Sequence, residues 1–239
     1  MIDFTLNNNM LLQINTVGEE QTPIIVIDDF VNNVDALINF AVFSQNARET
    51  FCAQESDFYP GVRKAAPLSY IEQLKALAPI INSHFNMADK SEFDVILSAF
   101  SIACTEPDKL RPIQMLPHFD TPNMKQLAMV HFLCDETHGG TSFYKHKALG
   151  YERITKERLI PYRQAIKQQA MAQKLHKNPH YINGSTALFE QIFSVEAKLN
   201  RVVIYPSNLL HSGNINAAND YACDPINGRL TISSFVVLC

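Results

Sequence analysis

The chain has 239 residues, of which 46% are hydrophobic and 18% are charged, and its formal net charge is −4. This composition is typical of a globular protein and excludes a disordered chain, a collagen and a disulfide scaffold. No apolar run approaches the roughly 18 residues of a membrane span. The first ten residues lack a basic stretch followed by a long apolar one, so we expect no secretory signal. The mild charge gives no argument for a nucleic-acid partner.

Five cysteines are scattered along the chain and none forms a CxxC pair. We therefore expect reduced, mostly buried thiols in a cytoplasmic protein. They are Cys52, Cys104, Cys134, Cys223 and Cys239.

The first ninety residues combine one strand with helices. Residues 24–28 form a short apolar run that predicts a buried strand. Apolar residues at helical spacing predict helices over about 32–46 and 68–86, and Pro79 is expected to bend or break the second. Residues 58–63 carry a Pro-Gly turn.

After residue 92, short runs with strand character follow one another, separated by Pro, Gly, Asn and Asp. This pattern predicts a β-sandwich or barrel, and the helices before it predict an α+β protein with helices packed on one face of a double-sheet core. We expect a single domain over 1–239, in which 1–92 support a β core over 93–239. The predicted strands are 93–104, 111–117, 127–134, 141–145, 201–205 and 229–238.

A basic insert interrupts the β core over about 145–185. Residues 145–177 hold nine Lys or Arg and two Glu, a local charge of +7, while the rest of the chain is at −11. Pro161 is well placed to begin a helix over about 161–175. The insert is either a solvated helix or a lid or docking surface for an acidic partner.

His118 and Asp120 are two residues apart in an extended segment, so their side chains project from the same face. His211 follows a later apolar strand and precedes Gly213, which leaves room for a ligand. Two histidines and one carboxylate form a facial triad that leaves adjacent metal positions open, as oxygen-activating iron requires. Among the other six histidines, His131 is the only rival ligand because it too lies in a predicted strand.

Arg229 begins the last predicted strand, and alternation places Thr231 on the same face. An arginine inside a β core is costly unless it meets an anion. Its planar fork suits a carboxylate, and a nearby hydroxyl can add a further hydrogen bond. A dicarboxylate held by Arg229 and Thr231 would reach the metal with its other end.

These motifs together resemble the Fe(II)/2-oxoglutarate-dependent dioxygenases, most closely the prolyl-hydroxylase-like branch. The resemblance rests on His118-Phe-Asp120, the Gly139-Gly140 pair, RVVIYPSNLLHSG and GRLTIS, and it covers about 93–239. It implies a double-stranded β-helix (jelly-roll) fold. It also implies that His118, Asp120 and His211 bind Fe(II), and that Arg229 and Thr231 bind the distal carboxylate of 2-oxoglutarate.

The resemblance further implies hydroxylation, or a similar oxidation, with O2 as co-substrate and with release of succinate and CO2. Asp120 favours hydroxylation because related halogenases carry a small residue there. Tyr59, Arg63, Gln114 and Tyr144 are candidates to line a substrate pocket. We expect a small-molecule or peptide substrate and no membrane partner, and exposed strand edges allow a homodimer.

Three alternatives are open. A cupin-type isomerase or thiol dioxygenase would typically show a His-x-His motif, which this sequence lacks. A nucleic-acid demethylase of the same superfamily would usually carry a second arginine six residues after the first, where this chain has Phe235. The third alternative is a metal-free binding or regulatory domain on the same β core.

Overall fold

Two antiparallel sheets make up most of the computed structural model, which describes residues 4–43, 50–53, 58–85, 92–216 and 220–239. The strands are β1 (Leu11–Val17), β2 (Thr22–Asp28), β3 (Gly61–Ala65), β4 (Phe93–Ala103), β5 (Gln126–Phe132), β6 (Thr141–His146), β7 (Phe189–Val195), β8 (Arg201–Pro206), β9 (His211–Gly213) and β10 (Leu230–Leu238). The helices are α1 (Val34–Phe43), α2 (Leu68–Leu74), α3 (Ala78–His84) and α4 (Lys156–Ala172), with short 3-10 helices η2 (Lys75–Leu77), η3 (Pro107–Lys109), η4 (Pro112–Met115) and η5 (Leu175–Lys177).

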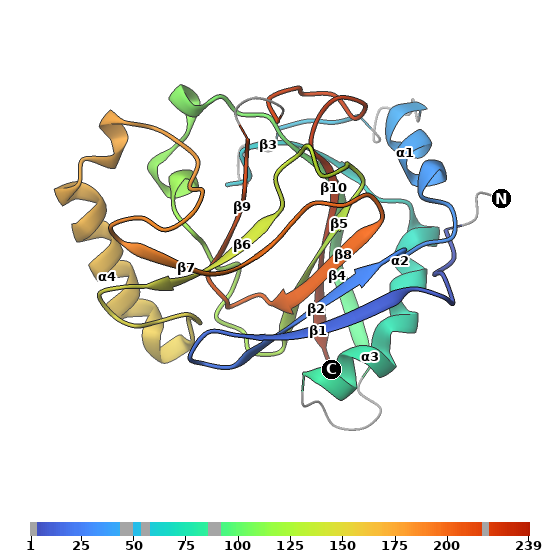
Figure 1. The fold of residues 1–239 in the computed structure, drawn as a ribbon, viewed down its shortest axis with the longest axis horizontal. Coiled ribbons are helices and arrows are strands. Elements are labelled where there is room, and N and C mark those ends of the chain that lie inside the picture. The colour runs from blue at the N-terminus through green and yellow to red at the C-terminus, as the bar shows by residue number, and fades with distance from the viewer. Residues whose placement is uncertain (1–3, 44–49, 54–57, 86–91, 217–219) are drawn as a thin grey trace.

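The large sheet has the strand order β1-β2-β8-β5-β10-β4-β3, and the small sheet has the order β7-β6-β9 (Figure 1). From β5 onward the chain crosses repeatedly between them: β5 belongs to the large sheet, β6 and β7 to the small one, β8 to the large, β9 to the small and β10 to the large. A single bridge between His118 and His211 extends the small sheet beyond β9.

The helices cover the two outer faces (Figure 1). Side chains of α1, α2 and α3 pack against the large sheet in the main hydrophobic core, and α4 packs on the small sheet through Tyr162. Strand β2 is buried on both sides, since Ile25 and Ile27 meet the helices while Ile24 and Val26 face the small sheet. The α+β arrangement of helices on a two-sheet β core therefore agrees with the sequence prediction.

Several local predictions were wrong. Residues 111–117 contain η4 instead of a strand. Pro112, at the start of η4, has no N–H that could donate a hydrogen bond to a neighbouring strand. Helix α4 begins at Lys156, so Pro161 lies inside it and does not start it. By contrast, the expected break of the second helix near Pro79 is confirmed, because η2 separates α2 from α3, which begins at Ala78. Residues 44–46 of the first predicted helix lie outside the described residues.

The prediction that all five cysteines are reduced was also wrong, because Cys104 and Cys223 form a disulfide with a Cα–Cα distance of 5.2 Å. They are 119 residues apart, and they meet because β4 and β10 are neighbours. Cys52, Cys134 and Cys239 are free thiols. A cytoplasmic location stays a prediction. None of the described helices has both the length and the apolar character of a membrane span.

Candidate metal and co-substrate site

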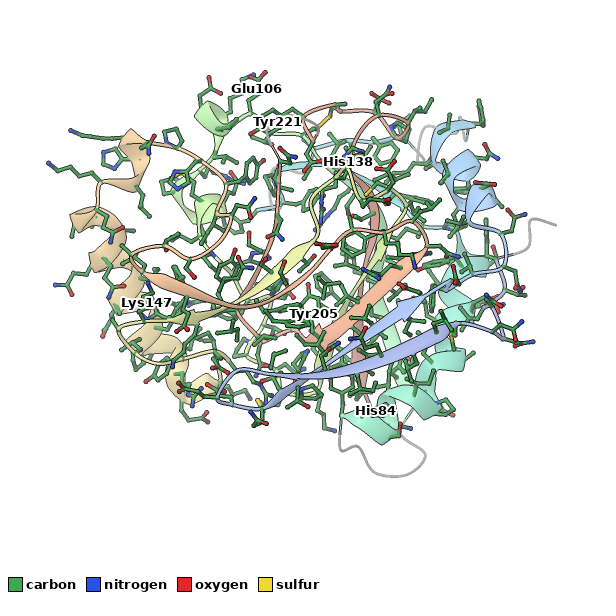
Figure 2. All side chains as sticks on the ribbon, viewed as in Figure 1. His84, Glu106, His138, Lys147, Tyr205 and Tyr221 are labelled. Carbon is green, nitrogen blue, oxygen red and sulfur yellow. A yellow bond between two sulfur atoms is a disulfide. The ribbon has the colours of Figure 1, made fainter. Side chains whose placement is uncertain are left out.

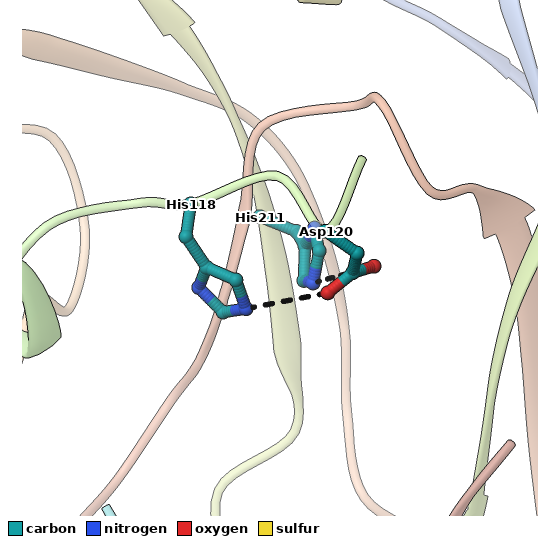
Figure 3. Close-up of side chains that lie close together, drawn as sticks. All are labelled: His118, Asp120 and His211. Atoms are coloured by element: carbon teal, nitrogen blue, oxygen red, sulfur yellow. Dashed lines mark ion pairs between the residues drawn. The ribbon is translucent and has the colours of Figure 1, made fainter. Parts of the chain in front are cut away.

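His118, Asp120 and His211 converge on one point, although His211 lies far along the chain (Figure 3). Their ligand atoms all lie within 4.8 Å of one another. Nε2 of His118 is 3.8 Å from Oδ1 of Asp120, and Nε2 of His211 is 3.8 Å from Oδ2. Atoms this close together can serve as ligands of one ion.

Backbone hydrogen bonds fix the two histidines opposite each other. The N–H of His118 donates to the carbonyl oxygen of His211 at 2.9 Å, and the reverse bond is 2.8 Å long. The N–H of Asp120 donates to the carbonyl oxygen of Ser207 at 2.8 Å, which ties this segment to the turn after β8. The extended backbone then sends the side chains of His118 and Asp120 to the same face, as the sequence predicted.

The donor set fits a divalent metal ion. Nδ1 of His211 lies 2.8 Å from the carbonyl oxygen of Leu209, and must therefore carry the proton and donate it. This tautomer leaves Nε2 with a lone pair toward the shared point, as in ligating histidines whose other nitrogen bonds a carbonyl. Oδ2 of Asp120 is buried and accepts no hydrogen bond from any described residue. A buried carboxylate oxygen without a donor is costly, and a cation would satisfy it.

The protonation states also suit metal binding. Burial lowers the pKa of His118 and of His211 to about 4, so both rings are neutral near pH 7. The side chain of His118 is nevertheless 53% exposed to the open cavity that it lines, so burial acts on it less than on His211, whose side chain is 7% exposed. Burial raises the pKa of Asp120 to about 6, while the positive charge of Arg63 acts in the opposite direction.

Arg229 is only 4% exposed and precedes β10. Its Nε donates to the carbonyl oxygen of Gly139 at 2.5 Å and its Nη2 to that of Gly140 at 2.7 Å. A guanidinium has five N–H groups, so part of the fork stays available for an anion. Thr231 is buried, and its hydroxyl donates to the carbonyl oxygen of Ser101 at 3.2 Å, which leaves its lone pairs as acceptors.

A cavity of about 430 Å³ between the two sheets joins these groups. It is lined by all three metal-site candidates, by Arg229 and Thr231, and by three of the four predicted substrate residues, Tyr59, Arg63 and Gln114. The proposed metal and co-substrate positions therefore share one cavity with most of the proposed substrate positions.

Tyr144 does not line the cavity, so the prediction that it belongs to the substrate pocket was wrong. It is fully buried on the outer side of the small sheet, where it packs with Ile154, Tyr162 and Phe189 beneath α4. Strand β6 alternates regularly: Thr141 lines the cavity and Phe143 lies in the core between the sheets, so Tyr144 points outward. The register shift beside Tyr144 places its extra residue, Ile192, on β7.

His131, the rival ligand, lies on the opposite face of the large sheet, under the helices. Tyr70 of α2 lies 3.1 Å from its Nδ1, and Asn200 Oδ1 lies 3.2 Å from its Nε2. Because the amide oxygen of Asn200 only accepts, Nε2 carries the proton and Nδ1 accepts from the Tyr70 hydroxyl. Both ring nitrogens of His131 are therefore hydrogen-bonded within the core, and neither is available to a metal ion.

Two features of the site were missed by the sequence reasoning. Tyr205 of β8, labelled in Figure 2, is one of the residues that line the cavity. Its ring centroid is 4.8 Å from that of His211. Asp220 is fully buried and accepts from Nδ1 of His138 at 2.7 Å and from the N–H of Gly139 at 3.3 Å, so it holds the turn that binds Arg229. Alternation within RVVIYP could have identified Tyr205 as inward-facing, whereas no local pattern marks Asp220.

Residues 8–236 match one family model, described as "Family of unknown function (DUF6445)". The chain belongs to this family. No curated protein matches the chain.

Solved structures show only distant similarity. AviO1 from Streptomyces viridochromogenes Tue57 has 15% identity and a TM-score of 0.42, with 86% of this chain and 80% of that chain covered. EctD from S. alaskensis with bound Fe has 13% identity and a TM-score of 0.43, over 99% and 88%. A prolyl hydroxylase from Trichoplax adhaerens, in complex with a hypoxia inducible factor oxygen degradation domain peptide fragment, has 9% identity and a TM-score of 0.41, over 97% and 84%.

Proposed function

We propose that this protein is an Fe(II)- and 2-oxoglutarate-dependent oxygenase on a double-stranded β-helix. One observation carries the proposal. Two histidine Nε2 atoms and a carboxylate oxygen that accepts no hydrogen bond from the described residues converge inside a cavity. The same cavity is lined by a buried arginine that uses only two of its five N–H groups in hydrogen bonds to the backbone. The repeated crossing of the chain between two antiparallel sheets over β5 to β10 supports the jelly-roll part of the proposal.

Each group has a defined role in this proposal. His118, Asp120 and His211 hold the metal, with His211 oriented by the carbonyl of Leu209. Arg229 binds the distal carboxylate of 2-oxoglutarate through its remaining N–H groups, and the Thr231 hydroxyl turns toward the same carboxylate. The metal and co-substrate together would supply O2 activation and oxidation of a substrate C–H bond, with succinate and CO2 as by-products. The cavity walls orient the reactants and exclude water.

The test is anaerobic titration of Fe(II) into the apo-protein with 2-oxoglutarate present, monitored by the weak visible charge-transfer band of chelated 2-oxoglutarate. The wild type is expected to show the band. His211→Ala is expected to abolish it, and Arg229→Gln is expected to raise the 2-oxoglutarate concentration at half-saturation. Iron binding without a band in the folded wild type would overturn the co-substrate assignment.

His84→Ala is the matched control, because His84 lies at the end of α3, remote from the site (Figure 2). It should leave the band unchanged.

A metal-free binding domain would bind neither iron nor 2-oxoglutarate stoichiometrically. For a nucleic-acid demethylase, the position six residues after Arg229 holds Phe235, which lines the cavity. We therefore propose a small-molecule or peptide substrate.

A further inference from the structure

The Cys104–Cys223 disulfide lies next to the residues that orient the arginine of the co-substrate site. Cys104 directly follows β4, and Cys223 lies six residues before Arg229. Asp220, three residues before Cys223, is the buried carboxylate that holds the Gly139–Gly140 turn. This turn binds the guanidinium of Arg229. The cross-link therefore anchors the middle of a short segment that carries Asp220 at one end and Arg229 at the other.

The two cysteines are held to the fold to different degrees. Residues 220–229 belong to no helix or strand, and Cys223 is exposed to solvent. Cys104 is partly buried, and the N–H groups of Cys104 and Thr105 both donate to the carbonyl oxygen of Pro60 at 3.1 Å. Cys104 is therefore the fixed end of the cross-link, and Cys223 is the end that gains freedom when the bond is broken.

The chain between the disulfide and Arg229 forms a closed turn. Oδ1 of Asp224 accepts hydrogen bonds from the N–H groups of Ile226 and Asn227, both at 2.9 Å. The N–H of Gly228 donates to the carbonyl oxygen of Asp224 at 3.0 Å. Because these bonds make the turn a compact unit, a displacement at the cysteine moves the arginine with it and is not absorbed between them.

The metal-site residues are fixed by other contacts. His118 and His211 are held by their mutual backbone hydrogen bonds, and Asp120 is held by the carbonyl oxygen of Ser207. None of these three bonds involves residues 220–229. A change confined to this segment should therefore alter the orientation of the arginine without altering the metal ligands.

We propose that the Cys104–Cys223 disulfide is a redox switch that sets the affinity of the site for 2-oxoglutarate. This inference rests on the proposed function of the site. In the oxidised protein, the cross-link holds Asp220 and Arg229 at the Gly139–Gly140 turn. In the reduced protein, the segment is free to shift, so the guanidinium meets the distal carboxylate of 2-oxoglutarate in a less favourable geometry.

The switch operates by thiol–disulfide exchange with a dithiol reductant. A thiolate of the reductant attacks Sγ of the exposed Cys223, which gives a mixed disulfide and releases Cys104 as a thiolate that takes up a proton. The second thiol of the reductant then displaces the sulfur of Cys223, which also takes up a proton, and the reductant leaves as a cyclic disulfide. Two electrons pass to the protein. Oxidised glutathione reverses the reaction and leaves as two molecules of reduced glutathione.

The test is calorimetry of 2-oxoglutarate binding to the Mn(II)-loaded full chain under argon, before and after reduction. The protein is reduced with dithiothreitol and freed of it by gel filtration. Thiol titration of denatured samples should count three free thiols before reduction and five afterwards. Reduction should raise the Kd for 2-oxoglutarate about tenfold, the effect of weakening one hydrogen bond to a charged group. The affinity for Mn(II) alone, measured by electron paramagnetic resonance, should not change.

Two variants and one control show whether the effect runs through the proposed residues. Cys104→Ser/Cys223→Ser should have the higher Kd with or without reduction. Arg229→Gln should lose little further affinity on reduction, because the group that the disulfide positions is already absent. Cys52→Ser, which removes an exposed free thiol, is the matched control and should respond to reduction as wild type does.

A Kd for 2-oxoglutarate that is equal in oxidised and reduced wild type would overturn this inference alone. Loss of Mn(II) affinity on reduction would overturn it too, since the disulfide would then support the whole site and not Arg229 in particular. The same fold-change on reduction in wild type and in Arg229→Gln would refute the action through Arg229. If the oxidised wild type showed no metal-dependent binding of 2-oxoglutarate, the proposed function would fail and the inference with it.

Discussion

Arg229 and Gly140 are 89 residues apart in sequence, and a 2.7 Å hydrogen bond joins Nη2 of Arg229 to the carbonyl oxygen of Gly140. The adjacent carbonyl oxygen of Gly139 accepts a hydrogen bond from Nε, so the Gly139–Gly140 turn binds one side of the guanidinium. Asp220 holds the same turn through the N–H of Gly139. The orientation of the arginine is thus set by backbone carbonyls, and its other side is left for a ligand.

Arg229→Lys should therefore impair co-substrate binding almost as much as Arg229→Gln, despite keeping the charge. A lysine ammonium cannot donate to both carbonyls and to a carboxylate with the geometry of a planar fork. We expect the KM for 2-oxoglutarate to rise by roughly ten- to hundredfold, since hydrogen bonds to charged groups contribute about 1.5–3 kcal/mol. Steady-state succinate release measures it. A KM for Arg229→Lys equal to that of wild type would show that charge alone suffices.

Gly140→Ala should destabilise the protein and weaken binding of 2-oxoglutarate. A Cβ at Gly140 would lie 1.9 Å from the carbonyl oxygen of Val195 on β7, and backbone cannot move away cheaply. Overpacking of this kind costs about 1–3 kcal/mol. Because the turn must shift, the carbonyls that orient Arg229 shift with it. Chemical denaturation and calorimetry of 2-oxoglutarate measure the two effects.

Gly150→Ala is the control for the glycine substitution. Gly150 has φ +69°, but no neighbouring atom lies within 4 Å of its added Cβ, so only backbone strain is introduced. Its unfolding free energy should fall by about 1 kcal/mol, and its affinity for 2-oxoglutarate should not change. If both variants lost affinity equally, the role of the Gly140 turn in orienting Arg229 would be refuted.

The disulfide predicts a stability difference between oxidised and reduced protein. Cys104 and Cys223 close a long loop, and removing such a cross-link typically costs about 2–5 kcal/mol. Reductant should therefore lower the Tm of wild type, while a Cys104→Ser/Cys223→Ser double variant should show the lower Tm without reductant. Cys52→Ser, which removes an exposed free thiol, is the control. A wild-type Tm that is insensitive to reductant would contradict the prediction.

Local patterns sufficed for some of these features and not for others. Alternation and apolar runs located β4, β5, β6, β8 and β10, because a strand with one or two buried faces carries that pattern itself. They missed β1, whose residues are mostly exposed at the sheet edge and therefore carry little apolar signal.

The site shows the same division. Spacing alone places His118 and Asp120 on one face, but their approach to His211 depends on the pairing of distant strands. The Cys104–Cys223 pair and the buried Asp220 depend entirely on tertiary neighbours. The outward direction of Tyr144 follows from alternation along β6 once Thr141 and Phe143 are known to face inward. The pairing of strands that are far apart in the sequence cannot be predicted from the pattern of a short segment.

His131 predicts a component of acid destabilisation. Burial lowers its pKa from 6.5 to about 3 in the folded protein, so below pH 6.5 the unfolded chain binds a proton that the folded chain does not. The free energy of unfolding should therefore fall as pH decreases from 6.5 toward 3, by up to about 1.4 kcal/mol per pH unit from this residue. Above pH 6.5 it contributes no slope.

His131→Gln tests this, because an amide can still accept from Tyr70 and donate to Asn200 but does not titrate. Its unfolding free energy should depend less steeply on pH between 6 and 4 than that of wild type, by about one proton per molecule. His118 and His211 also have lowered pKa values, but they are present in both proteins, so the difference isolates His131. Urea denaturation at several pH values gives the slopes. If the free energy of unfolding of the two proteins depended on pH with the same slope, His131 would bind its proton equally in the folded and unfolded protein. The conclusion that the folded protein keeps His131 neutral would then be wrong.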